Sequence, residues 1–289
     1  MRALTIPANW PLRNASRHIA SRPHLWHVQD LGAGPVLLLL HGAGGATHSF
    51  RNLIPLLAQT HRVIAIDLPG QGFTVPGSRL RCGLEAMAQD VRSLCIQENW
   101  HPTALIGHSA GAALALRVAQ IMPVSSVIGI NAALSNFDGV AGWVFPIMAK
   151  VLAMTPLVAT VFSKYAGTPG QVRQLIAATG SRIDHEGEAQ YLHLLRMSSH
   201  VDATLSMMAQ WNPGALMDSL PTQTTPCLLI TAAGDRAVPS TVSQKAAAAM
   251  PQARWVELPL YGHLVHEEAA DKVAALILGF LNSLEKPAS

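Results

Sequence analysis

The segment 107–111, which reads GHSAG, constrains the fold of this chain more than any other feature. It directly follows the apolar run TALI and directly precedes AALALRVAQ, a stretch rich in strong helix formers. A G-x-S-x-G sequence between a buried strand and a helix is typical of a nucleophile elbow, a tight turn that holds a serine hydroxyl above a sheet. Glycines suit such a turn because neighbouring backbone segments approach closely there. We therefore expect Ser109 to be a nucleophile at the end of a strand.

Strand-like and helix-like segments alternate on both sides of this turn. Most strand-like segments are continuous apolar runs, which is typical of strands buried on both faces of a parallel sheet. The first two alternate instead, and they suit an antiparallel edge. Strands are expected at 15–20, 25–30, 36–40, 62–67, 103–106, 125–131, 227–231 and 254–258. Helices of the core are expected at 49–59, 84–97, 110–121, 241–250 and 267–284. This pattern predicts an α/β fold with a mostly parallel, doubly wound, eight-stranded sheet, whose chemistry lies at the carboxyl ends of the strands.

The alternation stops between residues 135 and 219, where the sequence suits helices alone. Pro169 follows Thr168 as in a helix start, Gly180 suits a helix end, and Asp184 suits another N-cap. An all-helical block inside an α/β chain predicts a cap over the strand ends. The expected division is a first part of the core at 1–134, a helical cap at 135–219 and a second part of the core at 220–289.

Apolar and aromatic side chains of this cap are candidates for the lining of a substrate pocket. They are Trp143, Phe145, Met148, Met207 and Trp211. The alternative is that they only pack the cap on the core. Residues 139–163 contain a single charged side chain, that of Lys150, so peripheral contact with a membrane through the cap also stays open.

A serine nucleophile needs a base, and the base needs an acid that orients it. After an elbow of this kind, the acid comes next in the chain and the histidine last. Asp235 directly follows the buried run CLLITAAG, and His263 follows the next strand. Both therefore fall at the same edge of the sheet as Ser109, and Asp138 is the substitute acid. His266 lies beside two glutamates at the start of a helix, where a capping or surface role is expected.

The loop after the strand at 36–40 is rich in glycine and reads HGAGGA at 41–46. An oxyanion hole needs two backbone N–H groups, one from this loop and one from the residue after the nucleophile. The amides of Ala43 and Ala110 are the expected pair, with His41 as a hydrogen bonder beneath the loop. The spacing of His263 and His266 does not match the HExxH pattern of zinc enzymes, so we expect no metal and no cofactor.

Charge and cysteine content exclude other classes of protein. The net charge is only +3 and charged residues make up 13% of the chain, without basic runs, so a nucleic-acid partner is not expected. Three widely spaced cysteines without a CxxC pattern do not suit a disulfide framework. The first residues also lack the apolar segment of a signal peptide. A cytoplasmic protein, free or peripheral to a membrane, is expected.

Five short motifs together resemble the α/β-hydrolase superfamily: HGAGG, DLPGQG at 67–72, GHSAG, GD at 234–235 and GH at 262–263. The resemblance implies the nucleophile, acid and base of that family at Ser109, Asp235 and His263. Longer strings, among them DLPGQGFT, TGSRID at 179–184 and GHLVHEE, resemble the magnesium-chelatase accessory proteins of bacteriochlorophyll biosynthesis. That resemblance implies a setting in tetrapyrrole metabolism, with magnesium-chelatase subunits as partners.

Two functions follow as hypotheses. The first is a serine hydrolase that acts on an apolar carbonyl substrate by hydrolysis of an ester, thioester or C–C bond. A serine rather than an aspartate at the elbow argues against epoxide hydrolase chemistry, which needs an alkyl-carboxylate intermediate. The alternative is a non-catalytic protein on the same scaffold, which binds a tetrapyrrole or delivers it to magnesium chelatase, because a fold alone does not fix a function.

Overall fold

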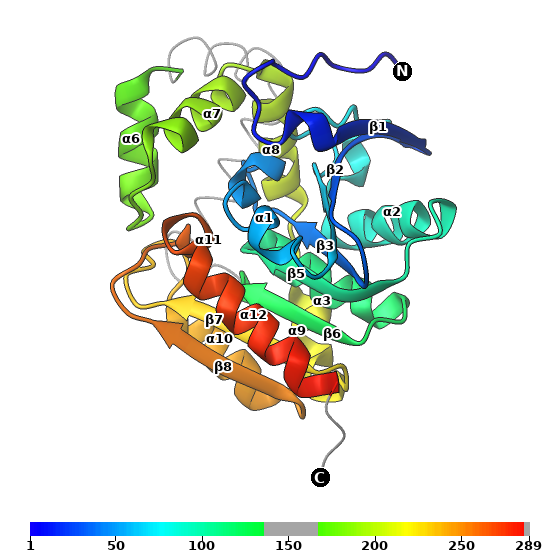
Figure 1. Ribbon diagram of the computed structural model, residues 1–289, viewed down its shortest axis with the longest axis vertical. Coiled ribbons are helices and arrows are strands. Elements are labelled where there is room, and N and C mark those ends of the chain that lie inside the picture. The colour runs from blue at the N-terminus through cyan, green and yellow to red at the C-terminus, as the bar shows by residue number, and fades with distance from the viewer. Residues whose placement is uncertain (136–166, 286–289) are drawn as a thin grey trace.

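An eight-stranded sheet forms the centre of the molecule in the computed structural model, which describes residues 1–135 and 167–285 (Figure 1). The spatial order of its strands is β1-β2-β4-β3-β5-β6-β7-β8. Their bounds are β1 Ser16–Ser21, β2 His24–Leu31, β3 Val36–Leu40, β4 Arg62–Ile66, β5 Pro102–His108, β6 Ser126–Ile130, β7 Cys227–Ala232 and β8 Ala253–Leu258. Strand β2 pairs antiparallel with β1 and with β4, and all other pairs are parallel. The predicted fold class, with its antiparallel edge, is confirmed.

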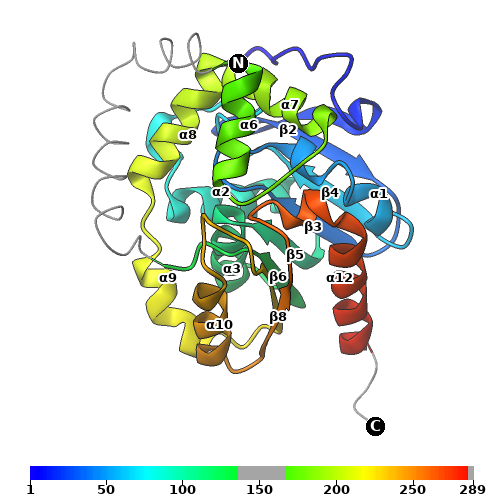
Figure 2. The same cartoon turned by 90° about the vertical axis from the view of Figure 1, so that its left-hand side faces the viewer.

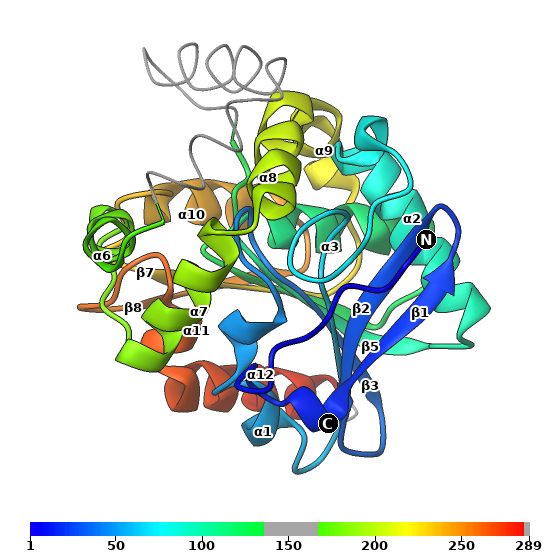
Figure 3. The same ribbon diagram turned by 90° about the horizontal axis from the view of Figure 1, so that it is seen from above.

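Helices cover both faces of the sheet (Figure 3). On one face lie α1 and α12, and their apolar side chains share a core with alternate residues of the strands, such as Leu37 and Leu39. On the other face lie α2, α3 and α10, which pack against residues such as Leu38 and Leu40. Both faces of β3 are therefore buried, as its continuous apolar run predicts. The bounds are α1 Ile54–Leu57, α2 Leu84–Gln97, α3 Ala110–Ile121, α10 Ser240–Ala249, α11 Val265–Glu268 and α12 Ala270–Glu285, with 3₁₀ turns at Arg13–Ala15, Thr47–Phe50, Arg79–Arg81 and Leu220–Thr222.

Two expected helices are interrupted in the structure. The segment 49–59 is not one helix, because a 3₁₀ turn ends at Phe50 and α1 starts only at Ile54. Pro55 explains the break, since it has no N–H to donate to the carbonyl of Arg51. At the C-terminal end, α11 and α12 are separated by Ala269, whose φ of −143° is not helical.

Of the described helices between β6 and β7, the first three lie over the carboxyl ends of the strands (Figures 1 and 2), whereas the fourth packs beside α3. In chain order, these helices are α6 Pro169–Ala178, α7 His185–Leu195, α8 Ser198–Gln210 and α9 Gly214–Ser219. The side chains of Thr168 and Asp184 accept N–H groups of the first turns of α6 and α7, and Gly180 has a φ of +84°, as their sequence signals predict. The division at residues 134 and 219 stays a prediction, and so do the roles of Trp143, Phe145 and Met148, which lie outside the described residues. Among residues 1–135 and 167–285, no helix is long and apolar enough to cross a membrane.

Candidate active site

The turn at Ser109 joins the end of β5 to the start of α3. Its φ of 54° and ψ of −118° are strained for a residue with a side chain. Glycines are required around it, because a Cβ at Gly107 would lie 2.2 Å from the carbonyl oxygen of Gly111, and one at Gly111 would lie 2.1 Å from that of Leu40. The GHSAG segment therefore forms the tight elbow that its sequence predicts, with Ser109 half-buried at the floor of a pocket.

Asp235 and His263 meet at the same edge of the sheet. The Nδ1 atom of His263 lies 2.7 Å from Oδ2 of Asp235, whose side chain is fully buried. The other carboxylate oxygen accepts the N–H groups of Ala237 and Val238 at 2.7 and 2.9 Å. Because an ionised carboxylate can only accept, His263 carries its proton on Nδ1, and its Nε2 atom has a free lone pair. Asp138, the substitute acid, lies outside the described residues.

The backbone of His263 is held by two side chains from neighbouring strand ends. Its carbonyl oxygen accepts hydrogen bonds from Nε2 of His108 at 2.9 Å and from Nδ2 of Asn131 at 2.8 Å. Asn131 also accepts the N–H of Ala232 at 2.9 Å, so it connects the ends of β6 and β7 to the histidine loop. Burial lowers the pKa of His108 well below its ordinary value, and this ring therefore stays neutral beside His263.

His266 is not at the surface, contrary to the sequence expectation. It is fully buried, and its ring lies 4.2 Å from that of His108 and 5.3 Å from that of Phe50, measured between centroids. Neither of its ring nitrogens has a hydrogen-bond partner among the described residues. Burial lowers its pKa to about 3. The helix start at Val265 turns His266 inward, so it has a packing role against the elbow.

The two amides predicted for the oxyanion hole lie beside the elbow. Ala110 is the first residue of α3, where backbone N–H groups have no intrahelical acceptor. Ala43 and Ala110 both line a chamber that also contains Ser109. The carbonyl of Gly42, in the same peptide group as the Ala43 N–H, accepts hydrogen bonds from the Gly45 N–H at 3.1 Å and from Nδ1 of His41 at 2.7 Å. His41 thus lies beneath the loop as a hydrogen bonder, as expected.

A short loop of the cap contacts both the acid loop and the histidine loop. The carbonyl oxygen of Thr179 accepts the N–H of Arg236 at 3.1 Å and that of His263 at 3.2 Å. The hydroxyl of Ser181 accepts the N–H of Leu264 at 2.8 Å. Gly180 lies between these contacts, and a Cβ there would be 2.0 Å from the carbonyl oxygen of Gly234. We call residues 179–181 the cap loop. It contacts the residues on both sides of Asp235 and of His263, a role that neither the helix-end signal of Gly180 nor the resemblance of this segment predicted.

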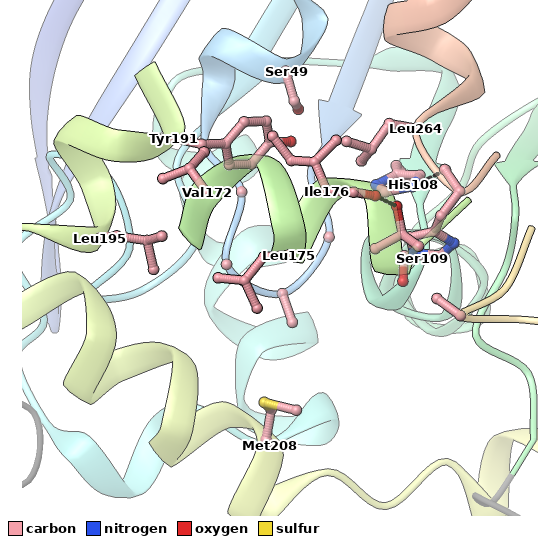
Figure 4. Close-up of a pocket in the computed structure, with 17 residues that line it drawn as sticks. Ser49, His108, Ser109, Val172, Leu175, Ile176, Tyr191, Leu195, Met208 and Leu264 are labelled. Carbon is pink, nitrogen blue, oxygen red and sulfur yellow. Dashed lines mark hydrogen bonds between the residues drawn. The ribbon is translucent and has the colours of Figure 1, made fainter. Parts of the chain in front are cut away.

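Two chambers meet at Ser109, and both are also lined by Ala43, Met208, Ala237 and His263. The larger has a volume of about 440 Å³ and extends away from Ser109 among apolar residues of α6 and α7 (Figure 4). Those residues are Val172, Leu175, Ile176, Leu195 and, from the start of α11, Leu264. The smaller has a volume of about 170 Å³ and is lined by Met207 and Trp211, the two described members of the predicted substrate-binding set. The described lining of α6 and α7 was missed because a half-apolar helix face predicts packing as readily as a pocket.

A network of charged side chains, buried except for that of Asp184, lies behind the larger chamber. Tyr191, which lines the chamber, donates its hydroxyl proton to Oε1 of Glu267 at 2.7 Å. The other oxygen of Glu267 is bonded to Arg51, which also donates to Asp184 at 2.7 Å. Burial raises the pKa of Glu267 to about 7 although the Arg51 guanidinium opposes this shift. The network attaches the start of α7 to α11, and no sequence pattern predicted it, because its members come from distant segments.

Comparisons with known proteins agree with this architecture. The family model described as the alpha/beta hydrolase fold matches residues 35–270. The magnesium-chelatase 30 kDa subunit of Rhodobacter capsulatus is 48% identical over 96% of this chain and 98% of its own length. The pimeloyl-[acyl-carrier protein] methyl ester esterase of Xanthomonas axonopodis pv. citri is 26% identical over 89% of this chain and 99% of its own length.

The structure of a thermophilic esterase from Thermogutta terrifontis superimposes with a TM-score of 0.77 over 94% of this chain and 99% of that chain. At 21% identity, that likeness shows the fold alone. The family match and the closely similar chelatase subunit show more. This chain belongs to the α/β-hydrolase fold family and, within it, to the family of the magnesium-chelatase 30 kDa subunit.

Proposed function

We propose that this protein is a serine hydrolase that cleaves an apolar carbonyl substrate. The observation that carries the proposal is the 2.7 Å contact between Asp235 and the Nδ1 atom of His263, which leaves Nε2 as a base in the same chamber as Ser109. The amides of Ala43 and Ala110 line this chamber as well, where they suit an oxyanion. Acid, base, nucleophile and oxyanion donors thus come from four loops at one edge of the sheet.

In this mechanism the Oγ atom of Ser109 attacks the substrate carbonyl while His263 removes its proton at Nε2. The negative charge that develops on the carbonyl oxygen is stabilised by the two amides and by the N-terminus of α3. Asp235 holds the imidazole in one tautomer and stabilises its protonated form. His263 then protonates the leaving group. In the second half of the reaction, His263 removes a proton from a water molecule that attacks the acyl-enzyme, and it returns a proton to Oγ of Ser109.

The chamber walls support an apolar substrate. Apolar side chains dominate the described lining of both chambers, from Val172 and Leu175 on α6 to Met207 and Trp211 near the end of α8. The charged side chains of Arg51 and Glu267 are bonded to each other behind Tyr191, and neither lines a chamber. Such walls favour a carbonyl compound with apolar groups on both sides of the bond that breaks.

A fluorophosphonate probe tests the hydrolase proposal directly. We expect covalent labelling of the wild-type protein and none of Ser109→Ala, because the probe reacts only with an activated serine. Hydrolysis of p-nitrophenyl butyrate should disappear in parallel. Labelling of Ser109→Ala at the wild-type rate, or no reaction of the wild-type protein with either reagent, would contradict the proposal.

One observation favours a second candidate, a tetrapyrrole-binding protein that assists magnesium chelatase. It is the 48% identity to the magnesium-chelatase 30 kDa subunit, which also suggests chelatase components as partners. Titration of Ser109→Ala with protoporphyrin, followed by absorbance, tests it because this variant cannot turn the ligand over. A saturable spectral change, together with no labelling of the wild-type protein, would favour the second candidate over the first.

A further inference from the structure

One face of α8 packs on two loops of the core. The first carries the proposed oxyanion donor Ala43, and the second contacts the first through Gln71. The face consists of His200, Ala203, Thr204 and Met207, spaced by three or four residues and thus aligned along the helix. Its partners are the loop at 42–45 and the loop at 70–72. A Cβ built at Gly70 would lie 2.5 Å from that of Ala203, so the helix approaches the second loop as closely as glycine permits.

Gly44 is held on both sides by side chains. Its N–H donates to Oε1 of Gln71 at 2.8 Å, and its carbonyl oxygen accepts from Nε2 of His200 at 3.2 Å. Gln71 is in turn fixed by α8, because its Nε2 donates to the sulfur of Met207 at 3.1 Å. The Gly44 carbonyl, whose residue has a φ of +76°, shares a peptide group with the Gly45 N–H, which donates to the Gly42 carbonyl at 3.1 Å. The Gly42 carbonyl belongs in turn to the peptide group of the Ala43 N–H, so a hold on Gly44 is transmitted to that donor.

The bonding of His200 selects one tautomer. Its Nδ1 atom lies 3.0 Å from the backbone nitrogen of Gly72, which can only donate, so Nδ1 carries no proton. The neutral ring therefore carries its proton on Nε2 and donates it to the carbonyl of Gly44. Both ring nitrogens are used, and the side chain is buried at 2% exposure. His200 thus connects the two core loops, whereas Thr204 and Met207 of the same helix contact Gln71.

We propose that His200 is a positioning residue, which orients the Ala43 N–H toward the oxyanion by holding the carbonyl of Gly44 from the cap. The proposal rests on the hydrolase function proposed above and adds to it that α8 takes part in forming the oxyanion hole. Rate loss from a misplaced donor falls on the transition state rather than on substrate binding, because the oxyanion exists only there. A residue that merely stabilises the cap has no such selectivity.

Three variants separate the two hydrogen bonds of His200, and a fourth variant is their control. Asparagine places an acceptor near the position of Nδ1 and keeps the bond to Gly72, whereas glutamine places a donor near the position of Nε2 and keeps the bond to Gly44. His200→Ala removes both, and His185→Ala is the matched control, because His185 is exposed on α7. The measurements are kcat and KM for p-nitrophenyl butyrate, the rate of fluorophosphonate labelling, and amide hydrogen exchange of the peptide that covers 42–46.

We expect His200→Ala to lower kcat and the labelling rate by about 10- to 100-fold, with KM changed by less than about threefold. His200→Gln should recover most of the loss, His200→Asn should recover little, and the control should match the wild type. Equal activity of the Gln and Asn variants, or wild-type kcat in His200→Ala, would overturn the proposal. If the wild-type protein has no hydrolase activity, amide hydrogen exchange tests the contact by itself. Faster exchange at 42–46 in His200→Ala and His200→Asn, but not in His200→Gln, would support the role of His200. Unchanged exchange in all three variants would refute it.

Discussion

At the scale of single residues, the strained conformation of Ser109 is what exposes its hydroxyl. Such a backbone costs about 1–3 kcal/mol, so it persists only where surrounding contacts hold it. Here they are the bonds from the Ser109 N–H to Ile130 and from the N–H groups of Ala112 and Ala133 to the Ser109 carbonyl, at 2.9, 3.0 and 3.1 Å. None of these bonds involves the hydroxyl, which is left for chemistry.

The first prediction follows from that independence. Ser109→Ala should lower esterase activity by about 10³-fold or more, because triad members act as a unit, and it should leave the urea midpoint nearly unchanged. Alanine keeps the Cβ, and within residues 1–135 and 167–285 the Ser109 hydroxyl has no hydrogen-bond partner that its loss would leave unpaired. A large shift of the urea midpoint, with activity retained, would reverse both parts of this expectation.

The second prediction concerns the choice between the two histidines. His263→Ala should abolish fluorophosphonate labelling, whereas His266→Phe should keep it within about tenfold of the wild-type rate, since His266 makes ring contacts alone. Phenylalanine preserves those contacts with His108 and Phe50. Loss of labelling in His266→Phe, with retention in His263→Ala, would assign the base to His266.

The sequence singled out Ser109, Asp235 and His263 because the elbow motif, the chain order and the predicted strand ends all indicate one edge of the sheet. It did not predict Asn131, although Asn131 donates to the carbonyl of His263. An asparagine directly after a buried strand suits a turn equally well, so its pairing with a loop 132 residues away leaves no local signal. His266 was misplaced for a related reason: neighbouring glutamates suggested solvent, but one of them, Glu267, is itself buried.

At the scale of elements, the cap loop contacts both the loop of Asp235 and the loop of His263. Thr179 and Ser181 accept N–H groups from the acid and histidine loops, and Gly180 packs against Gly234 and Gly262 without room for a side chain. Alternating strands and helices predicted where these loops lie, whereas their attachment to the cap depends on the backbone carbonyl of Thr179 and on one serine hydroxyl, neither of which forms a recognisable sequence pattern. Sequence patterns therefore located the elements but not this contact.

The third prediction uses two glycines of the cap. Gly180→Ala should lower the free energy of unfolding by about 2 kcal/mol or more, because its φ is +84° and its Cβ would meet the Gly234 carbonyl. Activity should fall as well, since the clash displaces the loop of Asp235. Gly170→Ala in α6 is the control: no atom lies within 4 Å of its Cβ, and we expect equal or slightly higher stability. Urea unfolding of both variants provides the measurement, and equal midpoints would refute the clash.

At the scale of the whole molecule, several titratable side chains near the site are buried, and burial shifts their pKa values. Burial lowers the pKa of His266 to about 3 and that of His200 to about 4, and it raises the pKa of Glu267 to about 7. A histidine whose pKa is lowered by folding contributes stability above its ordinary pKa, and this stability is lost as the pH falls. Glu267 acts in the opposite sense, because its stabilising protonated form is lost as the pH rises through about 7.

The fourth prediction is the resulting pH dependence. The two histidines outweigh the single glutamate, so the free energy of unfolding should rise from pH 4 to about 6.5, the ordinary pKa of histidine. His266→Phe removes one of the groups and should make this slope shallower, with little change at pH 7.5. The measurement is the urea midpoint across this range for both proteins. Parallel curves for the two proteins would show that protonation of His266 does not contribute to the loss of stability at low pH.

The hydrogen bonds accepted by the carbonyl oxygen of Thr179 limit how the cap of this protein can be removed or exchanged. This one atom accepts hydrogen bonds from Arg236, the residue after Asp235, and from His263. Removal of the cap from this chain would therefore do more than widen access to the pocket, because the loops of Asp235 and His263 would lose their common anchor. An exchange of caps between relatives therefore has to transfer residues 179–181 together with Gly234 and Gly262, the two glycines that pack against Gly180.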